Sequence, residues 1–105
     1  MPMFVSKWER RDTADRDALG HAALNICRWS RAQDGVRDAR FYWADADTVA
    51  FVTTVAPGSR WGIGSGLPPT ADGAKVQFAL SDLSRMVSTE AWQDAGVGEQ
   101  AFRLK

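Results

Sequence analysis

The sequence predicts an α+β fold with the element order β-α-β-β-α-β, in which a four-stranded antiparallel sheet carries two helices on one face. Three observations predict it. Four segments have the alternating or β-branched pattern of strands: 3–10, 36–44, 48–56 and 98–104. Two segments repeat apolar residues at helical spacing: 13–33 and 74–95. The short polar turn 45–47 joins two of the strands as a hairpin.

The first strand has apolar side chains on both sides, because Phe4 and Trp8 alternate with Met3 and Val5. The helix that follows, predicted near 13–33, presents one face to the core: Leu19, Ala22, Ala23, Ile26 and Ser30. Its capping residues are predicted as Asp12 or Thr13 at the start and Gly35 at the end.

The hairpin strands near 36–44 and 48–56 differ in their patterns. In the first, Ala39, Phe41 and Trp43 share one side, and Arg40 and Tyr42 share the other. The second, "TVAFVTTVA", is apolar or Thr on both sides. An antiparallel sheet with one solvated face should alternate cleanly, so we expect something to cover the second face of this sheet.

The second helix is predicted near 74–95. One helical face carries Val76, Ala79, Leu80, Leu83 and Val87, and Ser88 or Thr89 is expected to cap a last short helix, "EAWQDA". Phe78 lies off that apolar face, so it is expected to contact a partner or the Gly-rich loop, unless the helix start is irregular. "GEQAFRLK" supplies the closing strand, near 98–104.

This order, with both helices on one face of the sheet, is the ferredoxin-like arrangement, expected as the single domain 1–105. The element order, the chain length and the two-sided sheet resemble the dimeric α+β barrel superfamily. That resemblance implies two protomers packed sheet to sheet, each with a pocket between sheet and helices. Members include cofactor-free monooxygenases, haem-degrading enzymes, isomerases and stress-response proteins. Haem-degrading members carry a histidine on the second helix, which this sequence lacks there.

Composition excludes several functions. Thirteen basic and thirteen acidic residues give a formal net charge of zero, so no electrostatic footprint for nucleic acid appears. One Cys and one His exclude an internal disulfide and a closed Cys/His zinc site within the chain. No apolar run is long enough to span a membrane, and no signal peptide pattern opens the chain. We expect a cytoplasmic protein without metal or cofactor.

The Gly/Pro-rich stretch 57–73 is the candidate for a functional loop. Its "GIGSG" lacks both the dinucleotide-binding spacing and the GK[ST] of a P-loop, so a phosphate cradle is disfavoured. A lid or pocket rim and a surface excursion both remain open. Trp61 favours the rim, because a large apolar ring next to Arg60 is expected to pack on a pocket mouth or a second protomer.

His21 is predicted on the solvent face of the first helix, as a surface residue rather than a general base or ligand. Cys27 is predicted to be a buried, inert thiol. Asp12, Asp15 and Asp17 are more simply acids of a first helical turn than metal ligands.

Two function classes remain open at this point. One is a small-molecule pocket, of the cofactor-free monooxygenase or isomerase kind, for an aromatic or polyketide-like compound. The other is a non-catalytic homodimeric binding or scaffold protein. For the pocket, Arg60 and Trp61 are expected at the rim and Arg40 and Tyr42 as polar contacts; the complete set of candidate ligand-binding residues is Arg40, Tyr42, Arg60, Trp61 and Phe78.

Overall fold

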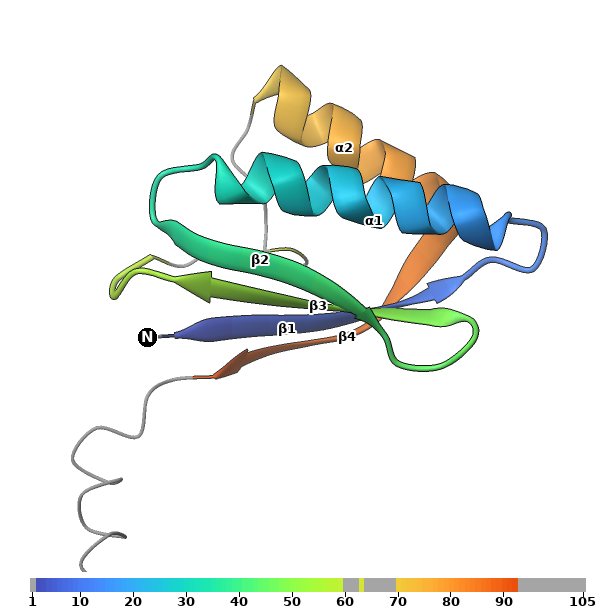
Figure 1. Cartoon of the computed structure of the whole chain (residues 1–105), viewed down its shortest axis with the longest axis horizontal. Helices are drawn as coiled ribbons and strands as arrows, with labels where there is room; N and C mark the ends of the chain where they lie inside the picture. Colours follow the sequence, from blue (N-terminus) through green and yellow to red (C-terminus); the bar gives the residue numbers. More distant parts are fainter. Residues whose placement is uncertain (1, 60–62, 64–69, 93–105) are drawn as a thin grey trace, which may run out of the picture.

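The structure, a computed structural model, describes residues 2–59, 63 and 70–92. Its elements follow the predicted order: β1 (Met3–Arg10), α1 (Arg16–Arg31), β2 (Val36–Trp43), β3 (Thr48–Val55), α2 (Ala71–Leu83) and β4 (Ser84–Trp92). The strands form one antiparallel sheet in the order β2-β3-β1-β4. Both helices lie on the same face of this sheet (Figure 1). The predicted ferredoxin-like fold class is confirmed.

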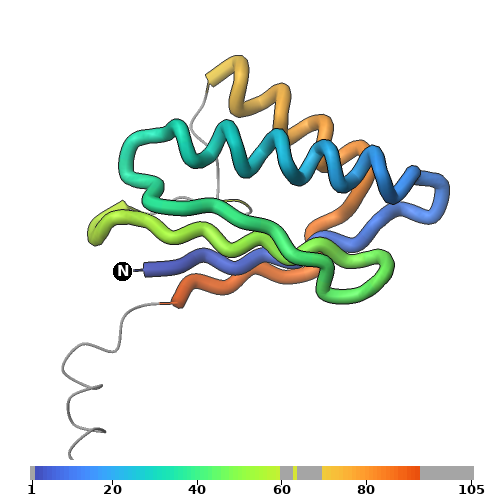
Figure 2. The backbone as a smooth tube through the Cα atoms, in the orientation of Figure 1, coloured from blue at the N-terminus to red at the C-terminus, as the bar shows by residue number. Residues whose placement is uncertain are grey.

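Strands β1 and β3 form the middle of the sheet, and β2 and β4 are its edges. The predicted hairpin of β2 and β3 is present, with Phe41 opposite Phe51. Figure 2 shows the chain passing directly from the end of α2 into β4, which runs beside β1 at one edge of the sheet. The two central strands contribute more buried side chains to the core than the two edge strands, whose buried residues are Ala39 and Ser84.

The core lies between the sheet and the helices. Alternate residues of β1 and β3 point into it, Phe4, Ser6 and Trp8 from the first strand and Val49, Phe51, Thr53 and Val55 from the second. The predicted inner face of α1 is confirmed, because the residues expected there are buried: Leu19, Ala22, Ala23, Ile26 and Ser30.

The ends of α1 differ from the prediction. Asp15 caps the helix, not Asp12 or Thr13, and its carboxylate accepts a hydrogen bond from the Ala18 N–H at 3.3 Å. The helix ends at Arg31, so Gly35 is not its stop. Gly35 instead turns the chain into β2. Its φ of +86° is a backbone conformation that residues other than glycine rarely adopt.

The second helix was predicted too far along the chain. It begins at Ala71, where the Thr70 hydroxyl accepts from the Gly73 N–H at 3.0 Å, and ends at Leu83. The chain then continues directly as β4, so the predicted helical face including Val87, and the short helix capped by Ser88 or Thr89, are wrong.

Tertiary pairing explains this correction. Strand β4 pairs with β1 along its whole length, from Met3 opposite Trp92 to Arg10 opposite Ser84. Without β4, the central strand β1 would leave one row of backbone groups unpaired, which outweighs the helical spacing of residues 84–92. The strand predicted at 98–104 lies outside the described residues.

The described part of the Gly/Pro-rich stretch begins with a tight turn at 56–59. Ser59 N–H donates to the Ala56 carbonyl at 3.0 Å, and Gly58 has φ +89° after Pro57. A proline at the second position and a glycine with positive φ at the third position are the signature of a type II turn. Among the described residues, no helix has both the length and the apolar composition needed to cross a bilayer.

Candidate functional site

The candidate site is a buried polar cluster on the helix-facing side of the two central strands. Ser6 lies on β1 and Thr53 on β3, and both side chains are 0% exposed. Between them sits Ile63, a residue of the connection between β3 and α2, which is 1% exposed. Three apolar side chains of the same core cluster accompany it: Trp8, Phe51 and Leu80.

Hydrogen bonds hold the Ile63 backbone at both of its polar groups. The Ser6 hydroxyl donates to the Ile63 carbonyl at 2.8 Å, and the Ile63 N–H donates to Thr53 Oγ1 at 3.3 Å. The Trp8 indole N–H donates to Ser6 Oγ at 3.1 Å. We call Ser6, Trp8 and Thr53 the buried anchor. It offers a fixed hydroxyl donor and a fixed hydroxyl acceptor in a site closed to water.

The anchor contains no charged group. Within the described part of the chain, Cys27 is the one buried residue with a side chain that titrates, and its burial raises the pKa of the thiol to about 12. At neutral pH the thiol is therefore protonated and a poor nucleophile, as predicted. The described interior can orient a neutral ligand by hydrogen bonds but supplies no general base to it.

Arg40 and Tyr42 share one side of β2, as predicted, and the structure directs that side away from the core. Tyr42 is 53% exposed, and Arg40 pairs with Asp38 at 2.6 Å, a contact that raises the pKa of the Arg40 guanidinium. Both line a hollow of about 390 Å³ at the outer edge of β2, together with Cys27 and Arg31. They do not meet the buried anchor, so their predicted role as polar ligand contacts stays a prediction.

Of the other predicted site residues, the structure describes Phe78, which is not part of the anchor. Phe78 is 68% exposed on a regular α2, so an irregular helix start does not explain its position. Arg60 and Trp61 lie outside the described residues.

His21 is exposed on α1, as predicted. It lines a hollow of about 330 Å³ beside Asp17, Phe41 and Trp43. The Arg16 guanidinium lies 3.8 Å from the centre of the Trp43 ring, a cation–π contact that fixes one wall of this hollow. This contact explains the positions of the Arg16 and Trp43 side chains without a bound ligand.

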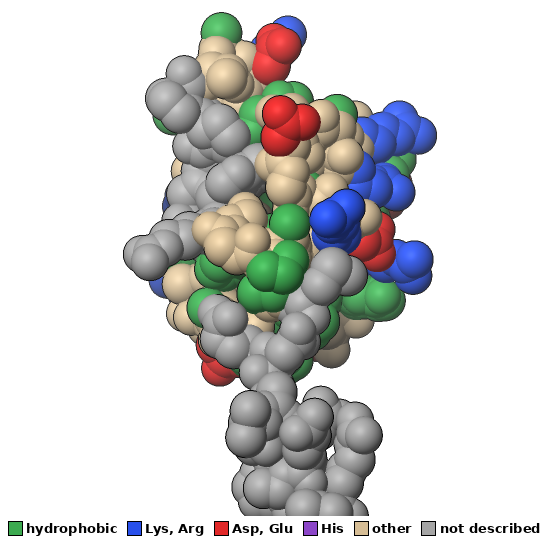
Figure 3. Space-filling view, turned by 90° about the vertical axis from the view of Figure 1, so that its left-hand side faces the viewer, with side chains coloured by type: hydrophobic (Ala, Val, Ile, Leu, Met, Phe, Trp, Pro, Cys, Tyr) green, Lys and Arg blue, Asp and Glu red, His purple; other side chains and the backbone are tan. Residues whose placement is uncertain are grey.

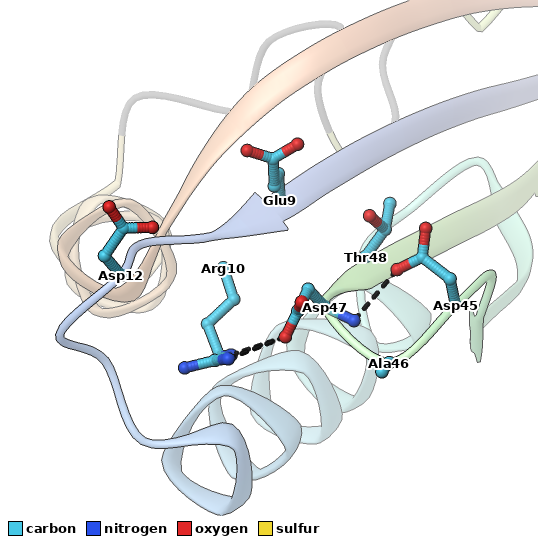
Figure 4. Close-up of a pocket in the computed structure, with 7 residues that line it drawn as sticks. All are labelled: Glu9, Arg10, Asp12, Asp45, Ala46, Asp47 and Thr48. Carbon is cyan, nitrogen blue, oxygen red and sulfur yellow. Dashed lines mark hydrogen bonds and ion pairs between the residues drawn. The ribbon is translucent and has the colours of Figure 1, made fainter.

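Another hollow, of about 500 Å³, lies where β1 ends and β3 begins (Figure 4). It is acidic, with Glu9, Asp12, Asp45 and Asp47 around it. Arg10 binds Asp47 at 2.6 Å, and the Asp47 N–H donates to Asp45 Oδ1 at 2.8 Å. Both contacts are dashed lines in Figure 4: the first ties the 45–47 turn to β1, and the second lies within the turn.

No group of three or more acidic, Cys or His side chains suited to a metal ion occurs within residues 2–59, 63 and 70–92. Basic side chains gather along one edge of the molecular end shown in Figure 3. Exposed arginines on α1 and β2 include Arg28, Arg31, Arg37 and Arg40. The acidic hollow and these arginines are exposed to solvent, whereas Ser6 and Thr53 of the anchor are buried.

Sequence reasoning missed the anchor. The available signal was the small polar Ser6 at an inward position between Phe4 and Trp8, and Thr53 at the equivalent position of β3. A hydroxyl on an apolar face must find a hydrogen-bond partner. That partner, Ile63, lies 57 residues from Ser6 along the chain, so local patterning could not identify it.

Comparison with known proteins is informative at the level of structure. No protein-family model matches the sequence, and no curated protein matches it. Solved structures do match. SnoaB from Streptomyces nogalater, a cofactor-independent oxygenase, matches with a TM-score of 0.69 at 9% identity, over 89% of this chain and 91% of SnoaB.

Two further structures agree. Rv0793 from Mycobacterium tuberculosis matches with a TM-score of 0.67 at 17% identity, over 90% of this chain and 95% of its own. A Nitrosomonas europaea protein, provisionally named an antibiotic biosynthesis monooxygenase, matches with a TM-score of 0.67 at 10% identity, over 90% and 98% of the two chains. The chain therefore has the same α+β ferredoxin-like fold as these solved structures.

Proposed function

We propose that this protein is a homodimeric, cofactor-free oxygenase that binds a planar aromatic, polyketide-like compound between its sheet and its helices. The observation that carries the proposal is the buried anchor: two hydroxyl groups and an indole N–H in an apolar interior, on a fold shared with a cofactor-independent oxygenase. Pockets for small organic ligands combine apolar walls with a few fixed polar groups in this way.

The chemistry suits such an interior. A cofactor-free oxygenation needs a substrate whose carbanion or enolate itself gives electrons to O₂. The protein then has to orient the substrate and exclude water, which does not require a buried charged residue. For an anthrone, the balanced reaction converts a ring CH₂ and O₂ into a ring carbonyl and water. One oxygen atom of O₂ enters the product and the other leaves as water.

The homodimer is supported by the outer face of the sheet. Val5 and Val52 lie opposite each other there, half-buried, and Trp92 is 50% exposed at the edge. Apolar side chains on an open sheet face are typical of an interface. Packing the outer faces of two protomers together would remove these side chains from water.

Oxygen uptake with dithranol (1,8-dihydroxyanthrone) tests the proposal. We expect the protein to accelerate oxygen consumption and to form the anthraquinone, with one ¹⁸O atom incorporated from ¹⁸O₂, in the presence or absence of EDTA. The heat-denatured protein and buffer give the background rate. If dithranol neither reacts faster nor raises the melting temperature of the protein, the oxygenase proposal fails and the scaffold function takes its place.

A further inference from the structure

Ile63 is a part of the protein's own chain that occupies a site built for hydrogen bonding. Its N–H, its carbonyl and its side chain are all buried against the sheet. Ser6 and Thr53 come from different strands, and both point at this one residue. A connection that runs over the surface can satisfy its backbone groups with water, whereas the buried N–H and carbonyl of Ile63 are bonded to these two hydroxyls.

The two anchor hydroxyls need a partner at all times. A buried hydroxyl without a hydrogen bond is destabilising, so Ser6 and Thr53 favour any group that presents an acceptor to one and a donor to the other. Ile63 meets both needs through atoms on two directly bonded carbons, its N–H on Cα and its carbonyl oxygen on the next carbon. The same donor and acceptor spacing occurs in an aromatic ortho-diol and in an α-hydroxyketone.

We propose that Ile63 is an internal occupant of the ligand site, and that an aromatic ortho-diol or α-hydroxyketone displaces it to bind Ser6 and Thr53. The inference rests on the proposed function and adds to it a class of aromatic ligand for the same site. The ring of the ligand takes the place of the Ile63 side chain beside Trp8 and Phe51, which belong to the same buried cluster. Its hydroxyl donates to Thr53 Oγ1, and its second oxygen accepts from Ser6.

This occupancy makes the protein self-inhibited. A ligand binds only the fraction of molecules in which Ile63 has left the anchor, so its apparent dissociation constant is raised by that fraction. Any change that weakens the hold on Ile63 while leaving the hydroxyls in place should tighten ligand binding. A purely structural role for Ile63 predicts no such gain.

Binding of 2,3-dihydroxynaphthalene, followed by calorimetry, tests the proposal, with 2,3-dimethoxynaphthalene as the probe that cannot donate. We expect Ile63→Ala to lower the dissociation constant of the diol about tenfold, because the competing side chain is gone. Ile63→Val, which keeps most of the packing, should shift it in the same direction by a smaller factor. Adding Ser6→Ala to Ile63→Ala should remove the gain.

Leu80→Ala is the matched control. It opens space in the same cluster but leaves the Ile63 backbone on Ser6 and Thr53, so it should not tighten binding of the diol. An equal gain in Leu80→Ala, or for the dimethoxy probe, would mean that the diol fills a cavity, and would overturn the inference.

Two other outcomes separate this inference from the proposed function. If dithranol is oxygenated but diol binding is indifferent to Ile63→Ala and Ser6→Ala, the internal occupant is wrong and the oxygenase stands. If neither the parent nor Ile63→Ala binds any aromatic probe, and dithranol is not oxygenated, both proposals fall.

Discussion

The Ile63 N–H donates to Thr53 Oγ1 across 3.3 Å, which joins the connection after β3 to the strand that it has just left. Thr53→Val removes this acceptor without changing the side-chain shape. We expect it to lower the free energy of unfolding by about 1–2 kcal/mol, because a buried N–H loses its partner. Urea unfolding measures this change.

Thr54→Val is the control for that measurement. Thr54 is the next residue of β3 and points to the half-buried outer face of the sheet. It should change stability by less than about 0.5 kcal/mol. Equal effects at the two positions would contradict a specific bond to Ile63.

The pKa of the Cys27 thiol predicts a loss of stability at high pH. The folded pKa is raised from 9.0 to about 12 by burial, so the neutral thiol is favoured in the folded state. This contribution is complete below pH 9 and is lost as the pH rises toward 12. Urea unfolding at about pH 8 and about pH 10 measures this effect. Between these two pH values the free energy of unfolding of the parent should fall by about 1 kcal/mol more than that of Cys27→Ala.

All other side chains are the same in the two proteins, so their contributions cancel in the comparison. Thiol labelling supplies an independent check, since a thiol-reactive disulfide should modify Cys27 far more slowly in buffer than in urea. Fast labelling of the folded protein would contradict the burial of Cys27.

Substitution on the outer face should separate the protomers of the proposed homodimer. Val52 lies on that face of β3, opposite Arg40 on one side and Val5 on the other. Val52→Asp places a carboxylate at the centre of the proposed interface, and burying that charge in a dimer is costly. In a free protomer the carboxylate stays in water, next to Arg40 on the neighbouring strand. Sedimentation equilibrium should show a dimer for the parent and a folded monomer for the variant.

Asn25→Asp, at an exposed position of α1, provides the same change of charge away from that centre. It should leave the dimer intact. A parent protein that sediments as a monomer at micromolar concentration would refute the assembly directly.

Two glycines should respond to alanine in opposite directions. Gly20 lies in α1, and a Cβ there would meet the Trp43 ring at an ordinary 3.7 Å. Gly20→Ala should therefore stabilise the protein by about 0.5–1 kcal/mol through helix propensity. Gly58 has φ +89° and open space around it, so Gly58→Ala should destabilise by about 1 kcal/mol through backbone strain alone. Thermal unfolding should separate the two variants by sign.

The sequence by itself determined the order of elements, the inward face of α1, and which side chains share a side in β1 and β2. The repeat from Leu19 to Ser30 in α1 points inward as predicted, and the alternation in β1 and β2 is present, but the sequence did not determine which side of these strands meets the helices. Local composition is sufficient there, because each pattern has the period of the element that it forms.

Only the tertiary structure decided where α2 ends and what the anchor holds. Apolar residues in 84–92 have helical spacing, but these residues form β4 because they hydrogen-bond to the edge of β1 that β3 leaves unpaired. Ser6 and Thr53 become one site only because β1 and β3 pair and bring both hydroxyls to Ile63. In both cases the deciding interaction is a hydrogen bond between residues distant in sequence, which no local periodicity records.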